Sequence, residues 1–255
     1  MKRLIQALLR KTGYEVHRLH HPLGSIKRPV CDIRSFLEDV KFRGFKPVGL
    51  IDVGANRGDW TRMALAVFPG LSGILIEPQN EMETSLLELC REMPRLRYVK
   101  AGAGKADGEL VQTIFNYFDN FTSSTFLLPV DSDQIKTGKQ RRTRIVTIDS
   151  ILSLPENRGF QPDLVKLDIQ GFELEALKGG DMLFGTTELF IIETSLFEFL
   201  PGQPLTRDVI GFMAGHGYEF YDVTNFMRRP YDGALGQLDI AFVKKDGRFR
   251  ASKEW

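Results

Sequence analysis

The chain has 255 residues, of which 42% are hydrophobic and 26% charged, and this length and composition are typical of one large α/β domain with short additions. A net charge of +1 excludes a strong overall attraction to nucleic acid, and no apolar run is long enough to span a membrane. Two cysteines, Cys31 and Cys90, with neither a CxxC pair nor a secretion signal, exclude a cysteine-rich zinc site. They indicate a reducing compartment, so we expect a cytoplasmic protein.

The segment 1–46 is predicted to be a helical extension that precedes the main domain at 47–255. Four apolar residues near its start share one helical face, with basic residues around them: Leu4, Ile5, Leu8 and Leu9. We interpret residues 1–11 as a helix packed on the domain. The alternative is a weak peripheral contact with an anionic membrane surface, at the inner face of the membrane. A second amphipathic helix is predicted over Asp32–Arg43.

Strands and helices then alternate along the chain. The predicted strands of the first half are Val48–Val53, Ile74–Glu77 and Leu96–Ala101. The predicted helices between them run from Trp60 to the stop at Pro69-Gly70, and over Glu81–Glu92. This alternation is the pattern of a parallel sheet that is covered by helices.

The middle of the chain has a different character. Glu109–Tyr117 and Arg144–Ile148 are predicted strands, because β-branched and aromatic residues alternate with polar ones. Between them, Asn120–Gln140 is predicted to be a long loop. A loop of this length is either functional or solvated and mobile, so we interpret it as a flap over the substrate, with a solvated loop as the alternative.

Regular alternation resumes in the last third. The predicted elements are strands at Leu164–Asp168 and Leu189–Glu193, helices at Glu173–Lys178 and Asp208–Ala214, and a closing hairpin of Tyr218–Val223 with Leu238–Val243. We therefore expect an α/β fold of three layers, with a mostly parallel seven-stranded sheet and a terminal antiparallel hairpin.

The first strand runs into a glycine loop that opens a helix. Gly54 and Gly58 lack the middle glycine of G-x-G-x-x-G, and no Gly-Lys-Ser/Thr follows, so neither a dinucleotide loop nor a P-loop is indicated. Asp52, two residues before the first glycine, would repel a phosphate but could accept hydrogen bonds from an ammonium group. The loop thus favours a ligand with an amino-acid moiety and an adenosine, such as S-adenosylmethionine (SAM).

The second strand ends in Glu77, about 20 residues beyond the loop, where an acidic side chain reaches the ribose hydroxyls of a bound nucleoside. Small residues at Ala101–Gly104 leave room for a purine. We therefore expect Ala101 and Gly102 to lie beside the adenine.

Three motifs resemble the FkbM family of SAM-dependent methyltransferases. They are Asp52-Val-Gly-Ala-Asn-Arg-Gly, Ile76-Glu-Pro, and Lys166-Leu-Asp-Ile-Gln-Gly-Phe-Glu-Leu-Glu-Ala-Leu-Lys-Gly-Gly. The resemblance implies a class I, Rossmann-like methyltransferase fold and O-methylation of hydroxyl groups on sugars, glycolipids or polyketides. It also implies a set of cofactor-binding residues: Asp52, Gly54, Asn56, Gly58 and Glu77.

Carboxylates at the ends of parallel strands meet at one edge of the sheet, so a base for the acceptor hydroxyl is expected there. Asp168 is our first choice, and a helix N-cap is its structural alternative. Lys166 shares a face with Asp168 and is expected to pair with it or with Glu193, which would lower the pKa of that carboxyl. Glu173 either complements its helix dipole or faces the site.

Other interpretations stay open at this stage. Asp168, Glu193 and Asp239 could hold Mg²⁺ through oxygen ligands, although we do not favour a metal. The protein could be an inactive methyltransferase fold that serves as a binding scaffold, or an NAD(P)-dependent oxidoreductase. The expected partner is a small-molecule, glycan or glycolipid acceptor, not a nucleic acid.

Overall fold

The computed structural model describes residues 29–116 and 123–254, so the predicted helix over residues 1–11 and its membrane contact lie outside the described part. The domain boundary at 46/47 stays a prediction, because no observation tests it. Within the described residues, no helix has the length and apolar character that a bilayer crossing requires.

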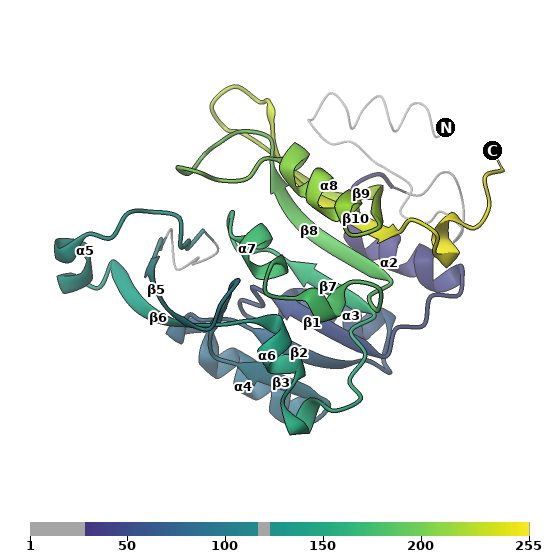
Figure 1. The fold of residues 1–255 in the computed structure, drawn as a ribbon, viewed down its shortest axis with the longest axis horizontal. Helices are drawn as coiled ribbons and strands as arrows, with labels where there is room; N and C mark the ends of the chain where they lie inside the picture. The colour runs from purple at the N-terminus through teal and green to yellow at the C-terminus, as the bar shows by residue number, and fades with distance from the viewer. Residues whose placement is uncertain (1–28, 117–122, 255) are drawn as a thin grey trace, which may run out of the picture.

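Seven strands form one sheet in the order β3-β2-β1-β7-β8-β10-β9, as Figure 1 shows. The strands are β1 (Gly49–Val53), β2 (Ser72–Ile76), β3 (Leu96–Val99), β7 (Leu164–Leu167), β8 (Leu189–Ser195), β9 (Tyr218–Arg228) and β10 (Leu235–Lys244). The pairs from β3 to β8 are parallel, and β10 is antiparallel to both β8 and β9. This is the class I, Rossmann-like methyltransferase arrangement, and the predicted fold class is confirmed.

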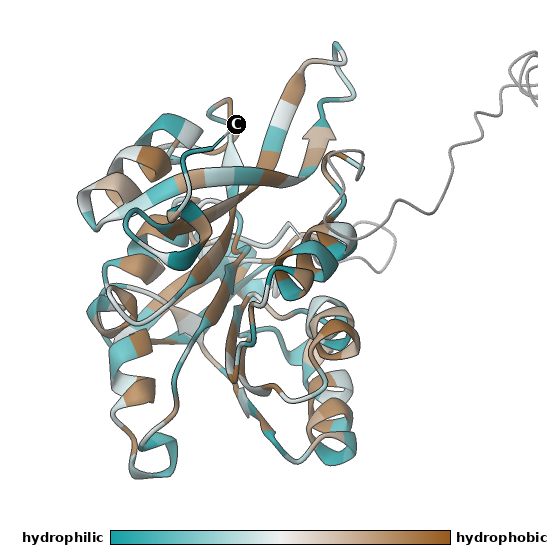
Figure 2. Ribbon diagram, turned by 90° about the vertical axis from the view of Figure 1, so that its right-hand side faces the viewer, coloured by the Kyte–Doolittle hydropathy of each residue, from teal (hydrophilic) through white to brown (hydrophobic). Residues whose placement is uncertain are grey.

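Helices cover both faces of the sheet (Figures 1 and 2). One face carries α2 (Ile33–Phe42), α3 (Asp59–Val67) and α4 (Glu83–Glu92), and the other carries α6 (Ile148–Leu152), α7 (Glu173–Leu177) and α8 (Thr206–Gly215). Single-turn helices join these elements: η1 (Asn80–Met82), η2 (Pro155–Asn157), η3 (Asp181–Leu183) and η4 (Arg248–Arg250). Two buried apolar clusters, one on each face, hold the layers together.

Alternation along the strands decides which helix layer each side chain meets. On β1, Leu50 belongs to the cluster under α2–α4, whereas Ile51 and Val53 belong to the cluster under α6–α8. Asp52 therefore points toward α3, on the same side as Leu50. On β7, Lys166 has the same orientation, and it pairs with Asp52 across the strands.

A smaller sheet of three strands stands beside the main one, in the order β4-β6-β5. Its strands are β4 (Gly102–Ala103), β5 (Gly108–Thr113) and β6 (Gln140–Val146), and α5 (Ser132–Lys136) precedes β6. In Figure 1 this sheet extends from the main body at the left, next to the carboxyl ends of the parallel strands.

Four sequence predictions for this region were wrong. The strand predicted over Glu109–Tyr117 ends at Thr113, and the described residues 114–116 lie in no strand. Asn120–Gln140 is not one continuous loop, because α5 and the first residue of β6 lie within it. The strand predicted over Arg144–Ile148 ends at Val146, since the Thr147 side chain accepts a hydrogen bond from Ser150 N and caps α6. The strand predicted over Leu96–Ala101 ends at Val99. Helices of five residues are too short to show helical periodicity, which explains why α5 and α6 were missed.

Candidate active site

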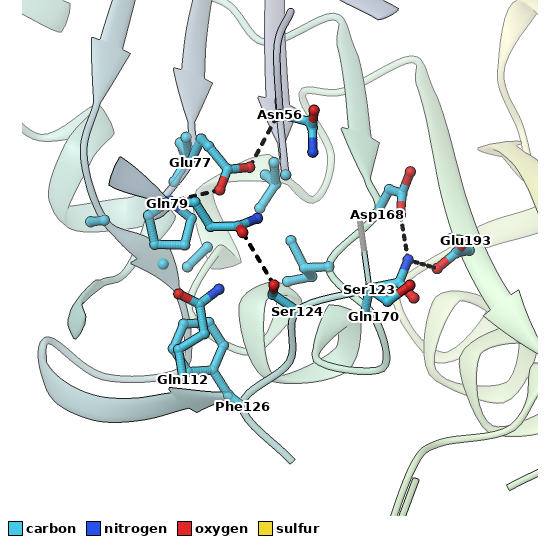
Figure 3. Close-up of a pocket in the computed structure, with 18 of the residues that line it drawn as sticks. Asn56, Glu77, Gln79, Gln112, Ser123, Ser124, Phe126, Asp168, Gln170 and Glu193 are labelled. Atoms are coloured by element: carbon cyan, nitrogen blue, oxygen red, sulfur yellow. Dashed lines mark hydrogen bonds between the residues drawn. The ribbon is translucent and has the colours of Figure 1, made fainter. Parts of the chain in front are cut away.

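A cavity of about 330 Å³ lies at the carboxyl edge of the main sheet, where β1 and β7 are neighbours and the strand order reverses. Open α/β sheets bind ligands at this position, and a volume of this size falls at the lower end of the range for ligand pockets, about 300–1,000 Å³. Figure 3 shows the side chains that line it, which come from the main sheet, the smaller sheet and the segment Ser123–Phe126.

The loop after β1 forms one wall and depends on a glycine. Gly54 has φ +81°, and a Cβ added there would clash with the carbonyl oxygen of Asp168 and lie 2.9 Å from Ile169 Cγ2. Only glycine permits both this left-handed conformation and the close approach to β7. Asn56 follows with φ +48° and also lines the cavity. Both predicted cofactor residues therefore lie at the site.

Gly58 has a different role from the one expected. It lies at the N-cap of α3 with φ +83°, and an added Cβ would approach Leu89 Cδ2 to 2.6 Å. Gly58 is not among the residues that line the cavity. It is required for the packing of α3 against α4, so its effect on a ligand is indirect.

Glu77, at the end of β2, is 3% exposed and lines the cavity. Its Oε2 accepts a hydrogen bond of 3.0 Å from Asn56 N, and its Oε1 accepts one of 3.0 Å from Gln79 N. Figure 3 shows both bonds. Burial raises the pKa of Glu77 above its ordinary value. The carboxylate joins the β1 loop to the β2 loop and presents its remaining lone pairs to the cavity.

Asp52 is one of the predicted cofactor-binding residues, but it does not line the cavity. It is fully buried, and its Oδ2 accepts a hydrogen bond of 2.6 Å from the Thr61 hydroxyl on α3. Burial raises its pKa, and its Oδ1 lies 3.8 Å from Lys166 Nζ. The alternation of β1 turns this side chain toward the helix layer, where it supports Lys166.

Lys166 pairs with Asp168, and their Nζ and Oδ2 atoms are 3.1 Å apart. This is one of the two pairings that the sequence left open, and no ion pair between Lys166 and Glu193 occurs in the described residues. Burial alone would lower the pKa of Lys166, but the carboxylates of Asp168 and Asp52 outweigh it and raise the pKa. Lys166 therefore carries a proton and neutralises part of the charge at the end of β7.

Gln170 connects two acidic side chains. Its Nε2 donates to Asp168 Oδ1 at 3.1 Å and to Glu193 Oε2 at 2.8 Å, as Figure 3 shows. Its φ of +54° is uncommon for a residue other than glycine, and such strain is concentrated at functional sites. The sequence motif that begins at Lys166 includes Gln170 but gave it no role. The structure shows that it orients both carboxylates.

Glu193 on β8 lies opposite Asp239 on β10, and both line the cavity. Burial, with the charges of Asp168, Glu173 and Asp239, raises the pKa of Glu193 well above its ordinary value. Burial and the charge of Asp168 raise the pKa of Asp239 to about 6. Both carboxyls therefore hold protons more strongly than exposed carboxyls do.

Glu173 is buried beneath the turn after β7 and does not line the cavity. Its Oε1 accepts hydrogen bonds from Ile169 N at 2.8 Å and Gly171 N at 3.2 Å. Burial raises its pKa to about 7. Glu173 thus fixes the turn that follows Asp168. The N-cap of α7 is Phe172, so Asp168 is not the helix cap that the alternative interpretation required.

The other end of the cavity is less acidic and has small side chains. Ala101, Gly102 and Ala103 line it as predicted, whereas Gly104 does not. The Ser124 hydroxyl donates to Gln79 Oε1 at 3.1 Å and closes this end against the smaller sheet (Figure 3). A flat, neutral ring would meet amide groups and small apolar residues here.

The ionisable side chains that line the cavity are all acidic. Among the described residues it contains four carboxylates and no Lys, Arg or His: Glu77, Asp168, Glu193 and Asp239. A phosphate or pyrophosphate would meet these carboxyl groups and no basic side chain of the lining. A cation or a neutral polar molecule is therefore the complementary ligand.

Residues 52–220 of the sequence match the methyltransferase FkbM domain. The chain belongs to the FkbM methyltransferase family. No curated protein matches the sequence.

Solved structures of methyltransferases are similar to this chain. Methyltransferase FkbM from Methylobacillus flagellatus KT is 18% identical with a TM-score of 0.48, over 80% of this chain and 47% of that one, so this chain spans about half of its length. Precorrin-6y C5,15-methyltransferase from Geobacter metallireducens GS-15 is 12% identical with a TM-score of 0.43, over 83% and 87% of the two chains. TrmK from M. capricolum, in complex with S-adenosyl-homocysteine (SAH), is 9% identical with a TM-score of 0.45, over 82% and 67%.

The described residues contain no group of three or more His, Cys, Asp and Glu side chains arranged to hold a metal ion. Asp168, Glu193 and Asp239 do lie around one cavity, as the magnesium interpretation required. However, Asp168 is paired with Lys166, and Gln170 donates to both Asp168 and Glu193. These donors occupy oxygen atoms that a metal would need, so this donor set does not fit Mg²⁺.

Sequence reasoning missed several polar and apolar residues of the lining. They are Gln79, Gln112, Ser123, Ser124, Phe126, Asn225, Met227 and Gln237. Most come from the smaller sheet, its adjoining segment and the β9–β10 hairpin. Strand-end acidity marked β2, β7 and β8, but no local signal identifies neutral residues that only tertiary contacts bring to the cavity.

Proposed function

We propose that this protein is a SAM-dependent O-methyltransferase that acts on a hydroxyl group of a sugar, a glycan or a secondary metabolite. The observation that carries the proposal is the lining of the cavity, which combines four carboxylates with no basic side chain among the described residues. SAM has a sulfonium and an ammonium group, so it complements this charge, whereas the pyrophosphate of NAD(H) does not. Membership of the FkbM family supports the same reaction class.

The residues fit the three parts of the cofactor. The backbone from Gly54 to Asn56 would hold the methionine part, and the Glu77 carboxylate would accept hydrogen bonds from the ribose hydroxyls. The small residues Ala101 and Gly102 would lie against the adenine. All of these residues line the cavity.

SAM supplies a methyl group that its sulfonium has already activated, so the protein must position the acceptor and take up a proton. Glu193 is the better candidate for the general base, in place of Asp168. Both oxygens of Asp168 are engaged, by Lys166 and by Gln170, while Glu193 forms no ion pair among the described residues. With SAM as the methyl donor and SAH as the leaving group, Glu193 would take up the proton that the acceptor hydroxyl loses.

Gln170 and Lys166 would act as positioning residues in this reaction. The Gln170 amide donates to Glu193 Oε2, which leaves the other oxygen of this carboxylate to face the acceptor hydroxyl. Lys166 and Asp168 form a neutral pair beside it, which limits the negative charge that accumulates when Glu193 ionises.

Calorimetric titration with SAH, SAM and NADH tests the proposal. We expect binding of both adenosyl ligands and none of NADH. Glu77→Gln should weaken SAH binding by about 10- to 100-fold, the equivalent of ~1.5–3 kcal/mol for hydrogen bonds to a charged group. Glu88→Gln, the same change at an exposed position of α4, is the matched control and should leave the affinity unchanged.

Circular dichroism of each variant establishes that it is folded. Binding of NADH without SAH by the folded wild-type protein would contradict the proposal in favour of an oxidoreductase. Absence of all three binding events would contradict it in favour of a scaffold protein.

A further inference from the structure

Exposed aromatic side chains gather next to the cavity on two segments that are far apart in the sequence. One segment is the loop after β8, and the other is the projecting end of the β9–β10 hairpin, and the two project side by side from the sheet in Figure 1. We call the following residues the aromatic patch: Phe197, Phe199, Met227, Arg229 and Tyr231. Their large apolar side chains are exposed to 38% at Phe197, 48% at Phe199, 56% at Met227 and 89% at Tyr231. The hairpin end also carries apolar residues in Figure 2.

The aromatic patch is held together by specific contacts. Leu196 N donates to Gly236 O at 2.9 Å and joins the loop to the hairpin. The guanidinium of Arg229 lies 4.2 Å from the ring centroid of Phe197 and 5.5 Å from that of Tyr231. These contacts join the loop after β8 to the hairpin and bring the rings of Phe197 and Tyr231 to the same guanidinium.

The patch has little net charge. Arg229 Nε and the guanidinium nitrogen Nη2 donate to the two carboxylate oxygens of Asp232 at 2.9 and 2.8 Å. This bidentate pair neutralises Arg229, so the surface lacks the excess positive charge that attracts anionic lipids. A neutral apolar group is the better complement to it.

The aromatic patch is continuous with the cavity. Met227 and Gln237 face each other across the hairpin, and both line the cavity. Gly236, the neighbour of Gln237, packs against the patch, since an added Cβ would lie 3.4 Å from Phe199 Cζ and 3.3 Å from Arg229 Cγ. A molecule whose hydroxyl reaches Glu193 can thus extend over Met227 onto the rings.

The two parts of this surface differ in chemistry. The cavity end has Glu193, Asp239 and Asn225, which suit hydroxyl groups, while the patch has rings and a thioether, which suit an apolar face. Exposed apolar surface of this kind, next to a polar pocket, marks a binding site. Its natural occupant is an amphipathic molecule.

We propose that the aromatic patch is a subsite for an apolar, flat group, such as an aryl group, that the acceptor carries beyond its reacting hydroxyl. The identification of this ligand as the acceptor rests on the proposed methyltransferase function. The acceptor would then be a glycoside or phenolic metabolite with an apolar substituent, and free monosaccharides would bind poorly.

Two glucosides that differ only in the aglycone test this subsite: 2-naphthyl and methyl β-D-glucopyranoside. Their binding to SAH-saturated protein is measured by ligand-observed NMR and calorimetry. We expect the naphthyl glucoside to bind roughly tenfold more tightly or better, because the ring buries apolar area on the patch. Phe197→Ala and Phe199→Ala should reduce the ratio of the two glucosides' affinities toward one. Phe42→Ala, which removes an aromatic side chain exposed to 63% on α2, is the matched control and should preserve it.

Equal binding of the two glucosides by the wild-type protein, no binding of either, or an unchanged ratio in both variants would overturn the proposal. Flotation with neutral and anionic phospholipid vesicles tests whether the aromatic patch binds a lipid bilayer instead. Vesicle binding that requires Phe197, with no preference for the naphthyl glucoside, would overturn the subsite proposal in favour of a bilayer. SAH affinity is measured in every variant. Absence of SAH binding by the wild-type protein would refute the methyltransferase function, whereas the ratio of the two glucosides' affinities reports on the patch alone.

Discussion

Glu173 offers a quantitative test of how the turn after β7 is held. Its carboxyl is buried and has a pKa raised to about 7 from an ordinary value of 4.5. The folded state therefore binds this proton more strongly than the unfolded state does. The free energy of unfolding should fall as the pH rises from about 4.5 to about 7 and then level off.

The magnitude follows from linkage. A difference of this size in pKa corresponds to ~3 kcal/mol in the free energy of unfolding, most of which lies between about pH 5 and about pH 8. Glu173→Gln keeps an oxygen that can accept from Ile169 N and Gly171 N but cannot ionise. The free energy of unfolding of the wild-type protein should thus fall by about 2 to 3 kcal/mol relative to that of the variant over this range.

Urea denaturation of both proteins at these two pH values measures the difference, with equal m-values as a check on two-state unfolding. Glu175→Gln, in the same helical turn, is the control: Lys178 and Lys105 lower the pKa of Glu175 despite partial burial, so its contribution should not decrease over this range. Parallel pH profiles for wild type and Glu173→Gln would refute the reasoning, since they would show that Glu173 ionises normally in the folded protein.

Three further predictions concern the site. Gly54→Ala should lower the free energy of unfolding by about 2 to 5 kcal/mol and abolish SAH binding, because the left-handed backbone and the close carbonyl of Asp168 both exclude a Cβ. Gly70→Ala is the control in the same denaturation assay, because a Cβ at Gly70 would meet no atom within 4 Å. Lys166→Met should lower the free energy of unfolding by about 3 to 5 kcal/mol, because it leaves Asp52 buried without its cation. In a double-mutant cycle, adding Asp52→Asn should restore part of this stability, whereas purely additive effects would argue against the pairing. For an accepted hydroxyl substrate, kcat/KM should rise with pH as Glu193 loses its proton above its raised pKa. Glu193→Gln should lower kcat/KM about 10²- to 10⁴-fold and retain the affinity for SAH. If kcat/KM of this variant still rises with pH as in the wild-type protein, Glu193 is not the base.

The main sheet was predictable because its signals are local. The apolar runs of β1, β2, β7 and β8 were located to within a few residues, since each strand is buried on both faces and ends at a turn. The helices α3, α4 and α7 were located equally well. The cofactor loop was predictable for the same reason, because Gly54 and Glu77 carry their signal in the residue type itself.

The smaller sheet was less predictable. Its strands pair residues across the segment that includes α5, and Gly108 pairs with Ile145 through contacts that no local window contains. The edge strand β9 also extends beyond the predicted Val223 to Arg228, because pairing with β10, rather than hydrophobic alternation, maintains it.

The sequence by itself determined the family, the strand-end acids and the requirement for glycine at position 54. Tertiary structure decided what each acid contacts. Asp52 and Glu77 both end apolar strands, yet the alternation of β1 turns Asp52 toward Thr61 and Lys166, while Glu77 reaches the cavity. Asp168 and Glu193 differ for a similar reason, because Lys166 lies within 3.1 Å of the first and pairs with no oxygen of the second. A residue type defines what a side chain can do chemically, but its charge state and its partners depend on which strands are neighbours, and only the folded chain specifies that.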